Sequence, residues 1–123
     1  MDADKQKGLE VDSPYVDLAV EVFSMLADAT RVRIVLALRE GELPVNALAE
    51  AVGKSPAAVS QHLAKLRLAR MVGTRHEGQR VFYRLVDEHA RQLVADAIFQ
   101  AQHSVDNLPP HHLTQNAVSV PES

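Results

Sequence analysis

Four of the six histidines in this 123-residue sequence lie in its last third, at His89, His103, His111 and His112. Neutral imidazole is a common ligand of transition metals, so this group suggests a metal site. His89 and His103 are fourteen residues apart. On one helix they would share a face but stand about 21 Å apart. Two such helices packed antiparallel across a two-fold axis would bring His89 of one copy close to His103 of the other. We therefore expect two equivalent metal sites per dimer; the alternative is that these are ordinary surface and tail histidines.

Possible oxygen ligands and a proline-containing segment lie close in sequence to His89 and His103. Asp87 and Gln100 fall near the same face of the expected helix. Two consecutive prolines then precede the His111–His112 pair and favour an extended, semi-rigid chain. By folding back, this arm would add ligands and raise the coordination number of the metal.

A second group of residues has the chemistry needed to bind DNA. Residues 45–84 read as a short helix, a glycine turn, a second helix with a polar free face, and a basic hairpin, which is the order of a winged helix-turn-helix. Lys54 and Ser55 would hold phosphates at a helix N-terminus. Small residues such as Ala57 let the backbone approach the groove, where Ser60 and Gln61 would meet base edges. The predicted DNA-binding residues are Lys54, Ser55, Ala57, Ser60, Gln61, Lys65, Gln79 and Arg80.

Apolar periodicity and capping residues predict the elements that position these groups. We expect helices at 15–27, 29–39, 45–52, from 56 onward, and from 87 or 88 to about 104, with strands at 72–76 and 81–85. Asp28 and Ser55 are natural N-caps, and Gly53 stands where a helix end needs positive φ. His62, beside the apolar Leu63, is expected to be a half-buried structural histidine, with a DNA contact as the alternative.

These elements predict a mainly α protein with a small β-hairpin. Residues 14–106 would form the winged helix-turn-helix domain. The polar residues 1–13 are expected to be disordered, and residues 107–123 to form a flexible, histidine-containing tail.

Composition narrows the class of protein further. The chain has no cysteine, which excludes disulfides and thiolate metal sites. No segment resembles a signal peptide or a membrane span, so we expect a cytoplasmic protein with no membrane partner.

Residues 53–84 contain seven basic residues and one acidic residue, a net charge of +6, which leaves −9 for the rest of a chain whose net charge is −3. The basic charge coincides with the expected recognition helix and wing, where phosphate contacts are needed. No arrangement typical of an enzyme active site is present.

Together these residues resemble the ArsR/SmtB family of dimeric bacterial repressors. The similarity runs from the first helix to the tail histidines and includes L-A-D-A-T-R-V-R-I-V, A-V-S-Q-H-L-A-K-L-R and G-Q-R-V-F-Y-R-L. Ala29 stands where the family usually has proline. The resemblance implies a homodimer formed through the first and last helices and a double-stranded operator as partner.

The resemblance also implies where a metal would bind. A cysteine site used by some members is absent, because its place is taken by Leu43-Pro44-Val45-Asn46. A site on the last helix matches Asp87, His89 and His103, with Gln100 at the third ligand. Nickel- and cobalt-sensing members, which share the V-E-V-F-x-M-L-A-D-A-T-R-V segment, imply ligands at His89, His103, His111 and His112. They also have a glutamate where this sequence has Gln102.

The sequence therefore predicts a repressor that binds operator DNA without metal and is released by Ni(II) or Co(II). Nitrogen and oxygen ligands without sulfur, in a set larger than four, favour these ions over tetrahedral Zn(II). The alternatives are a repressor of the same family that responds to Zn(II) or to a non-metal inducer, and a small metal-storage protein without DNA function.

Overall fold

The computed structural model describes residues 8–106, and its elements follow the order expected of a winged helix-turn-helix. They are α2 (Val16–Met25), α3 (Ala29–Ala37), the 3-10 turn η1 (Leu38–Glu40), β1 (Leu43–Pro44), α4 (Val45–Val52), α5 (Pro56–Leu68), β2 (Val72–Glu77), β3 (Arg80–Leu85) and α6 (His89–Asp106). Residues 1–7 and 107–123 lie outside the described part of the chain, and so do the expected tail and most of the expected disordered segment. Residues 8–15 form turns, and Ser13 among them is buried.

The helix boundaries form where the local signals predict them. The Asp28 side chain accepts a hydrogen bond from the Arg31 backbone N–H at 3.0 Å and begins α3. Ser55 caps α5 in the same way through the Ala58 N–H at 3.1 Å, with Pro56 at the first helical position. Gly53 ends α4 at φ 72°, in the left-handed region that favours glycine. The turn between the two helices of the helix-turn-helix is therefore set by Gly53, Ser55 and Pro56, three residues within a stretch of four.

The core lies where α3, α4 and α5 meet, with contributions from the sheet and α6. Its largest fully buried side chains are Ile34, Val35, Leu48, Val59, Leu63 and Leu66. Three of them, Val59, Leu63 and Leu66, come from one side of α5, as the periodicity predicts. The opposite side of α5 is exposed to solvent. The apolar core therefore determines which side of this helix is available to a partner.

The sheet has three strands rather than the two expected. β2 and β3 form the predicted hairpin, closed by Gly78 at φ 62° and Gln79. β1 pairs antiparallel with the other side of β3, with Leu43 opposite Tyr83 and Pro44 opposite Phe82. A two-residue strand containing proline has no periodicity to reveal it, so the sequence predicts no strand between the helices expected at 29–39 and 45–52.

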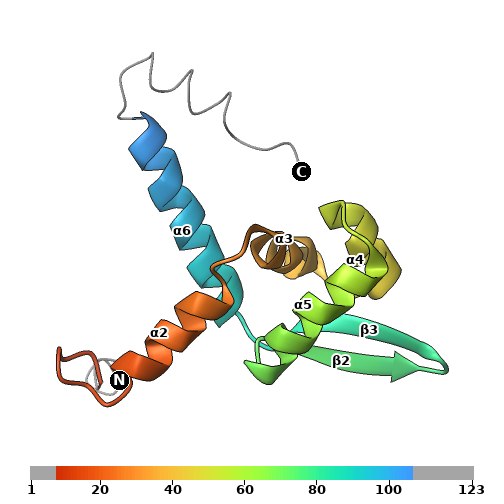
Figure 1. Cartoon of the computed structure of the whole chain (residues 1–123), viewed down its shortest axis with the longest axis horizontal. Coiled ribbons are helices and arrows are strands. Elements are labelled where there is room, and N and C mark those ends of the chain that lie inside the picture. The colour runs from red at the N-terminus through yellow and green to blue at the C-terminus, as the bar shows by residue number, and fades with distance from the viewer. Residues whose placement is uncertain (1–7, 107–123) are drawn as a thin grey trace.

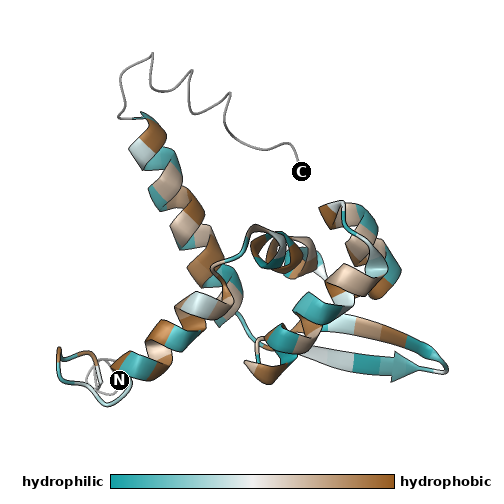
Figure 2. Cartoon of the chain, in the orientation of Figure 1, coloured by the Kyte–Doolittle hydropathy of each residue, from teal (hydrophilic) through white to brown (hydrophobic). Residues whose placement is uncertain are grey.

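Two helices project from the core and leave apolar surface uncovered. Figure 1 shows α6 rising from the body of the molecule and α2 extending to the side opposite the β2–β3 hairpin. No residue of α2 is buried, and its apolar side chains give the brown bands of Figure 2. Phe23 on α2 and Phe99 on α6 are 60% and 56% exposed. Apolar surface of this extent on two neighbouring helices is typical of an association surface.

Gly53→Ala should lower the free energy of unfolding by about 1 kcal/mol, because a Cβ is disfavoured in the left-handed conformation of this residue. Urea unfolding followed by circular dichroism would measure the change. Glu50→Ala, an exposed residue of the same helix, serves as the control and should change the free energy of unfolding by less than about 0.5 kcal/mol. Equal stability of the Gly53→Ala and wild-type proteins would contradict the assigned turn geometry.

Candidate DNA-binding surface and the histidine-bearing helix

The N-terminus of α5 opens onto solvent. Lys54, Ser55 and Ala57 are all exposed around it. The first backbone N–H groups of a helix have no partner within the helix and carry partial positive charge. Ser55 accepts from the Ala58 N–H and Pro56 has no N–H, so the N–H groups of Ser55 and Ala57 are the donors left for an anion. The geometry suits a phosphate group.

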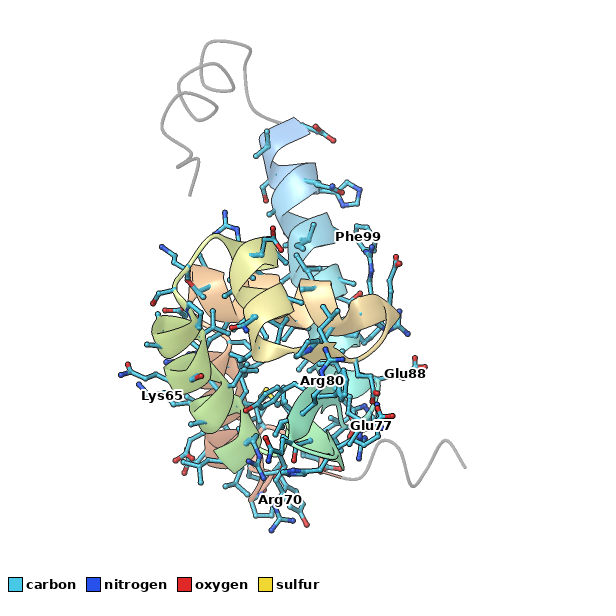
Figure 3. The ribbon with its side chains drawn as sticks, turned by 90° about the vertical axis from the view of Figure 1, so that its right-hand side faces the viewer. Lys65, Arg70, Glu77, Arg80, Glu88 and Phe99 are labelled. Carbon is cyan, nitrogen blue, oxygen red and sulfur yellow. The ribbon has the colours of Figure 1, made fainter. Side chains whose placement is uncertain are left out.

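The exposed side of α5 carries the other polar residues predicted from the sequence. Ser60, Gln61 and Lys65 are exposed, while Val59 and Leu63 on the opposite side are buried. Figure 3 shows Lys65 pointing from α5 into open space. The structure therefore brings Ser60, Gln61 and Lys65 together on one face with the helix N-terminus.

The β2–β3 hairpin holds one of its arginines tightly and leaves another available. Arg75 Nε donates to Glu42 Oε1 at 2.7 Å, and its Nη2 lies 3.4 Å from Glu77 Oε1. Both Arg75 and Arg80 stack on the Phe82 ring, at 4.7 and 4.9 Å from its centroid. Within residues 8–106, Arg80 forms no salt bridge. Arg80 is therefore oriented by an aromatic ring while its charge stays available to a ligand.

The Glu42–Arg75 contact changes the electrostatics of the hairpin. The hydrogen bond from Arg75 lowers the pKa of the Glu42 carboxyl below its ordinary value, and Glu42 in turn raises the pKa of Arg75. Arg75, one of the seven basic residues of the segment 53–84, is thus paired with Glu42, which lies outside that segment. No local sequence pattern points to Glu42, because this residue lies 33 positions before Arg75.

The expected metal ligands occupy the two ends of α6. His89 is the first residue of this helix, and its backbone N–H donates to Asp87 Oδ1 at 2.9 Å. His103 lies in the last turn and is exposed, as are Gln100 and Gln102. His111 and His112 lie outside the described residues. Across the described part of a single chain, no three metal-ligating side chains come together. A site at His89 and His103 therefore needs a second copy.

The surface beside these histidines suits a second copy. An apolar groove with a volume of about 320 Å³ runs between α2, α3 and α6, lined in part by Phe23, Leu26, Leu93 and Ile98. At 100° per residue, Leu93 lies about 40° around α6 from His89. The other α6 residues that line the groove lie about 80–180° around the helix from His89, so the groove adjoins His89 only along its Leu93 edge.

Comparison with known proteins assigns the chain to a family. A model described as "Bacterial regulatory protein, arsR family" matches residues 28–74, from the cap of α3 into β2. The chain is also 59% identical over 97 residues to the HTH-type transcriptional regulator KmtR of Mycobacterium tuberculosis, a match that covers 79% of this chain and 75% of that protein. The chain belongs to the ArsR family.

Further similarities confirm the predicted fold of this ArsR-family protein. It is 38% identical over 103 residues to the HTH-type transcriptional regulator NmtR of Mycobacterium tuberculosis, covering 83% of this chain and 85% of NmtR. The solution structure of a homodimeric winged helix-turn-helix domain of a possible ArsR-family regulator from Mycobacterium bovis is similar, with a TM-score of 0.69 and 29% identity. That similarity covers 80% of this chain and 94% of the other. The ArsR-family chain is thus a DNA-binding transcriptional repressor with a winged helix-turn-helix fold.

Within residues 8–106, no helix combines the length and the apolar character that crossing a bilayer requires.

Glu42→Gln should destabilise the repressor in a pH-dependent way. Because the pKa of Glu42 in the folded state lies below its ordinary value of 4.5, the ion pair stabilises the fold fully above that pH. Its contribution is lost as the pH falls through the folded-state pKa. The difference in free energy of unfolding between wild type and Glu42→Gln should therefore be largest near neutral pH and shrink below pH 4.5.

Urea unfolding at a series of pH values would test this. Glu50→Gln provides the control, because Glu50 is exposed and forms no ion pair within residues 8–106. A Glu42→Gln effect that stayed constant from pH 7 to pH 3 would rule out the ionic contact as its cause.

Proposed function

We propose that two copies of this chain form a repressor that binds operator DNA without metal and releases it on binding Ni(II) or Co(II). The observation that carries the proposal is the placement of His89 and His103 at opposite ends of α6, a helix that also contributes to an uncovered apolar groove. An antiparallel partner helix in that groove would complete each site with a histidine from the other copy. Because His89 and His103 stand about 21 Å apart on one straight helix, a site that uses both of them has to be shared between copies.

The ligand chemistry supports the choice of metal. Histidine nitrogen with carboxylate or amide oxygen suits Ni(II) and Co(II), whose preferred coordination exceeds four. Asp87, Gln102, His111 and His112 would complete the set, as the resemblance to nickel- and cobalt-sensing members implies. With the amide of Gln102 in place of a carboxylate, we expect weaker binding than a carboxylate would give. Response to Zn(II), or to a non-metal inducer, is the alternative.

Metal and DNA would be coupled through the geometry of the dimer. Two recognition helices reach successive major grooves only at one separation and orientation. A metal joining α6 of one copy to α6 of the other would favour a different arrangement. The coupling is reciprocal, so bound operator must weaken metal binding by the same factor as metal weakens operator binding.

On the DNA side, Lys54, Ser55 and Arg80 are proposed to bind phosphates, and Lys65 to add charge along α5. Ser60 and Gln61 are proposed to read bases, with Ala57 allowing close approach and Gln79 supporting the hairpin tip. Their common exposure on α5 and the β2–β3 hairpin supports this assignment. A double-stranded operator is the expected partner, in the cytoplasm.

Arg80→Gln should weaken DNA binding at all sequences and reduce its salt dependence. Each lost phosphate contact lowers the slope of log K against log salt by about 0.9, so a dimer should lose about two. Fluorescence anisotropy between 50 and 200 mM salt, with a duplex from the upstream region of the chain's own gene, would measure the slope. Arg39→Gln, an exposed arginine in η1 that lies near the Arg84–Leu85 end of β3 and not at the hairpin tip, should leave it unchanged. An unaltered slope for Arg80→Gln would remove this residue from the interface.

His103→Ala should abolish release by metal while leaving metal-free operator binding intact. The same anisotropy assay, titrated with Ni(II), Co(II) and Zn(II), would measure release. Ser104→Ala, an exposed neighbour on the same turn of α6, should behave as wild type. Release of His103→Ala by nickel at stoichiometric levels would exclude the α6 site. Wild-type binding unmoved by any metal would favour a non-metal inducer, and wild-type protein that bound metal but no DNA would favour storage.

A further inference from the structure

Arg31, in the first turn of α3, forms hydrogen bonds to two other helices, α2 and α5. Its Nε donates to His62 Nδ1 on α5 at 3.1 Å. Its Nη1 donates to the Met25 backbone carbonyl at the end of α2, also at 3.1 Å, and lies 3.4 Å from the Met25 sulfur. One planar guanidinium thus bonds α2 and α5 at the same time; the three helices are labelled in Figure 1.

Neighbouring residues fix both the Met25 carbonyl that accepts from Arg31 and the main chain of Arg31 itself. The last carbonyls of a helix lack intrahelical donors, and Arg31 supplies one to Met25. Asp28 holds the backbone of Arg31 through its N-cap hydrogen bond, which is the main cause of the lowered pKa of this carboxyl. Asp28 Oδ1 also lies 4.0 Å from His62 Nδ1. The guanidinium is therefore anchored by its own main chain before it contacts either helix.

His62 lies on α5 at the boundary between its exposed face and its buried face. Its side chain is 23% exposed and lies between the exposed Gln61, a proposed base-reading residue, and the buried Leu63. Since Nδ1 accepts from Arg31, the imidazole proton must sit on Nε2. The expectation of a half-buried structural histidine is thereby confirmed, and its partner is now identified.

Apolar packing alone gives α5 little directional restraint. Burial of Val59, Leu63 and Leu66 favours contact with the core, but the hydrophobic effect is non-directional. A hydrogen bond from a charged, planar donor has a defined direction and is stronger than a neutral one. The Arg31–His62 bond therefore restrains the rotation of α5 relative to α3 and α2.

We propose that Arg31 and His62 are positioning residues that couple the orientation of the recognition helix α5 to α2, the helix with the uncovered apolar face. Neither side chain needs to touch DNA. The link transmits the arrangement of α2 in the dimer to the residues at 60 and 61, so that operator affinity depends on an intact Met25–Arg31–His62 chain of hydrogen bonds. This proposal rests on operator binding by the dimer, as set out under the proposed function.

Two substitutions of His62 separate the hydrogen bond from the bulk of the ring. In His62→Asn the amide oxygen takes nearly the place of Nδ1 and accepts from Arg31, whereas His62→Leu fills similar space without an acceptor. We expect His62→Leu to lose at least tenfold in operator affinity and His62→Asn to stay within about threefold of wild type, measured by anisotropy.

Substitution of Arg31 tests the bridge itself. Arg31→Lys keeps the charge, but one ammonium group lacks the fork that reaches both Met25 and His62. We expect a loss similar to that of His62→Leu, and no further loss when the two are combined, because both break one link. Arg33→Lys on the same helix is the matched control, since Arg33 forms no side-chain hydrogen bond within residues 8–106.

Readouts besides operator affinity distinguish positioning from a general loss of structure. Affinity for a random duplex at low salt and the monomer–dimer equilibrium by sedimentation should stay within twofold of wild type in every variant. Long-range ¹H–¹⁵N spectra should show an unprotonated Nδ1 for His62 in wild type and a shifted signal in Arg31→Lys.

Three results would overturn the proposal. The first is operator binding by His62→Leu as tight as that of wild type, the second is failure of His62→Asn together with His62→Leu, and the third is a fall in random-duplex binding in parallel with operator binding. In each of these cases the wild type still binds the operator, so the proposed function stands. Failure of the wild-type protein to bind its operator would instead contradict the proposed function, and this proposal with it.

Discussion

The one-sided burial of α5 is the constraint on which the rest of the structure depends. Val59, Leu63 and Leu66 pack into the core formed with α3 and α4, so the polar side of α5 must face solvent. Hydrophobic burial supplies the free energy that holds this helix. The same burial decides which polar residues a ligand can reach. The proposed DNA contacts are thus a consequence of core packing as much as of their own chemistry.

The second constraint is apolar surface that one chain cannot cover. α2 contributes no buried residue, and the groove between α2, α3 and α6 is lined almost wholly by apolar side chains. Covering this surface with a second copy would hide it from water and set His89 and His103 beside another helix. Dimer contact and metal site would then share one surface, which is the physical basis for coupling them. A metal bound there could alter the arrangement of the dimer directly.

Polar contacts between distant segments orient the elements around the core. Glu42 fixes Arg75 on the hairpin, and both Arg75 and Arg80 stack on the Phe82 ring. Arg31 joins the end of α2 to His62 on α5. Most of these groups are partly exposed, so each contact adds limited free energy to the fold. These contacts matter because they are directional. Apolar packing tolerates small rotations of one element against another, whereas a guanidinium that is hydrogen-bonded on two sides restrains them.

The amino-acid sequence by itself determined the helices, the hairpin, the caps at Asp28 and Ser55, and the exposed face of α5. The helices and caps depend on residues within three or four positions of one another, and the hairpin pairs residues no more than 13 positions apart, so local patterns report them. Only the tertiary structure decided the pairing of β1 with β3, the Glu42–Arg75 contact and the Arg31–His62 bond. The last two join residues 33 and 31 positions apart, and side chains so separated meet only after the chain has folded. The location of the histidines was evident from the sequence. That one chain leaves His89 and His103 at opposite ends of α6 follows from the rigid geometry of the helix.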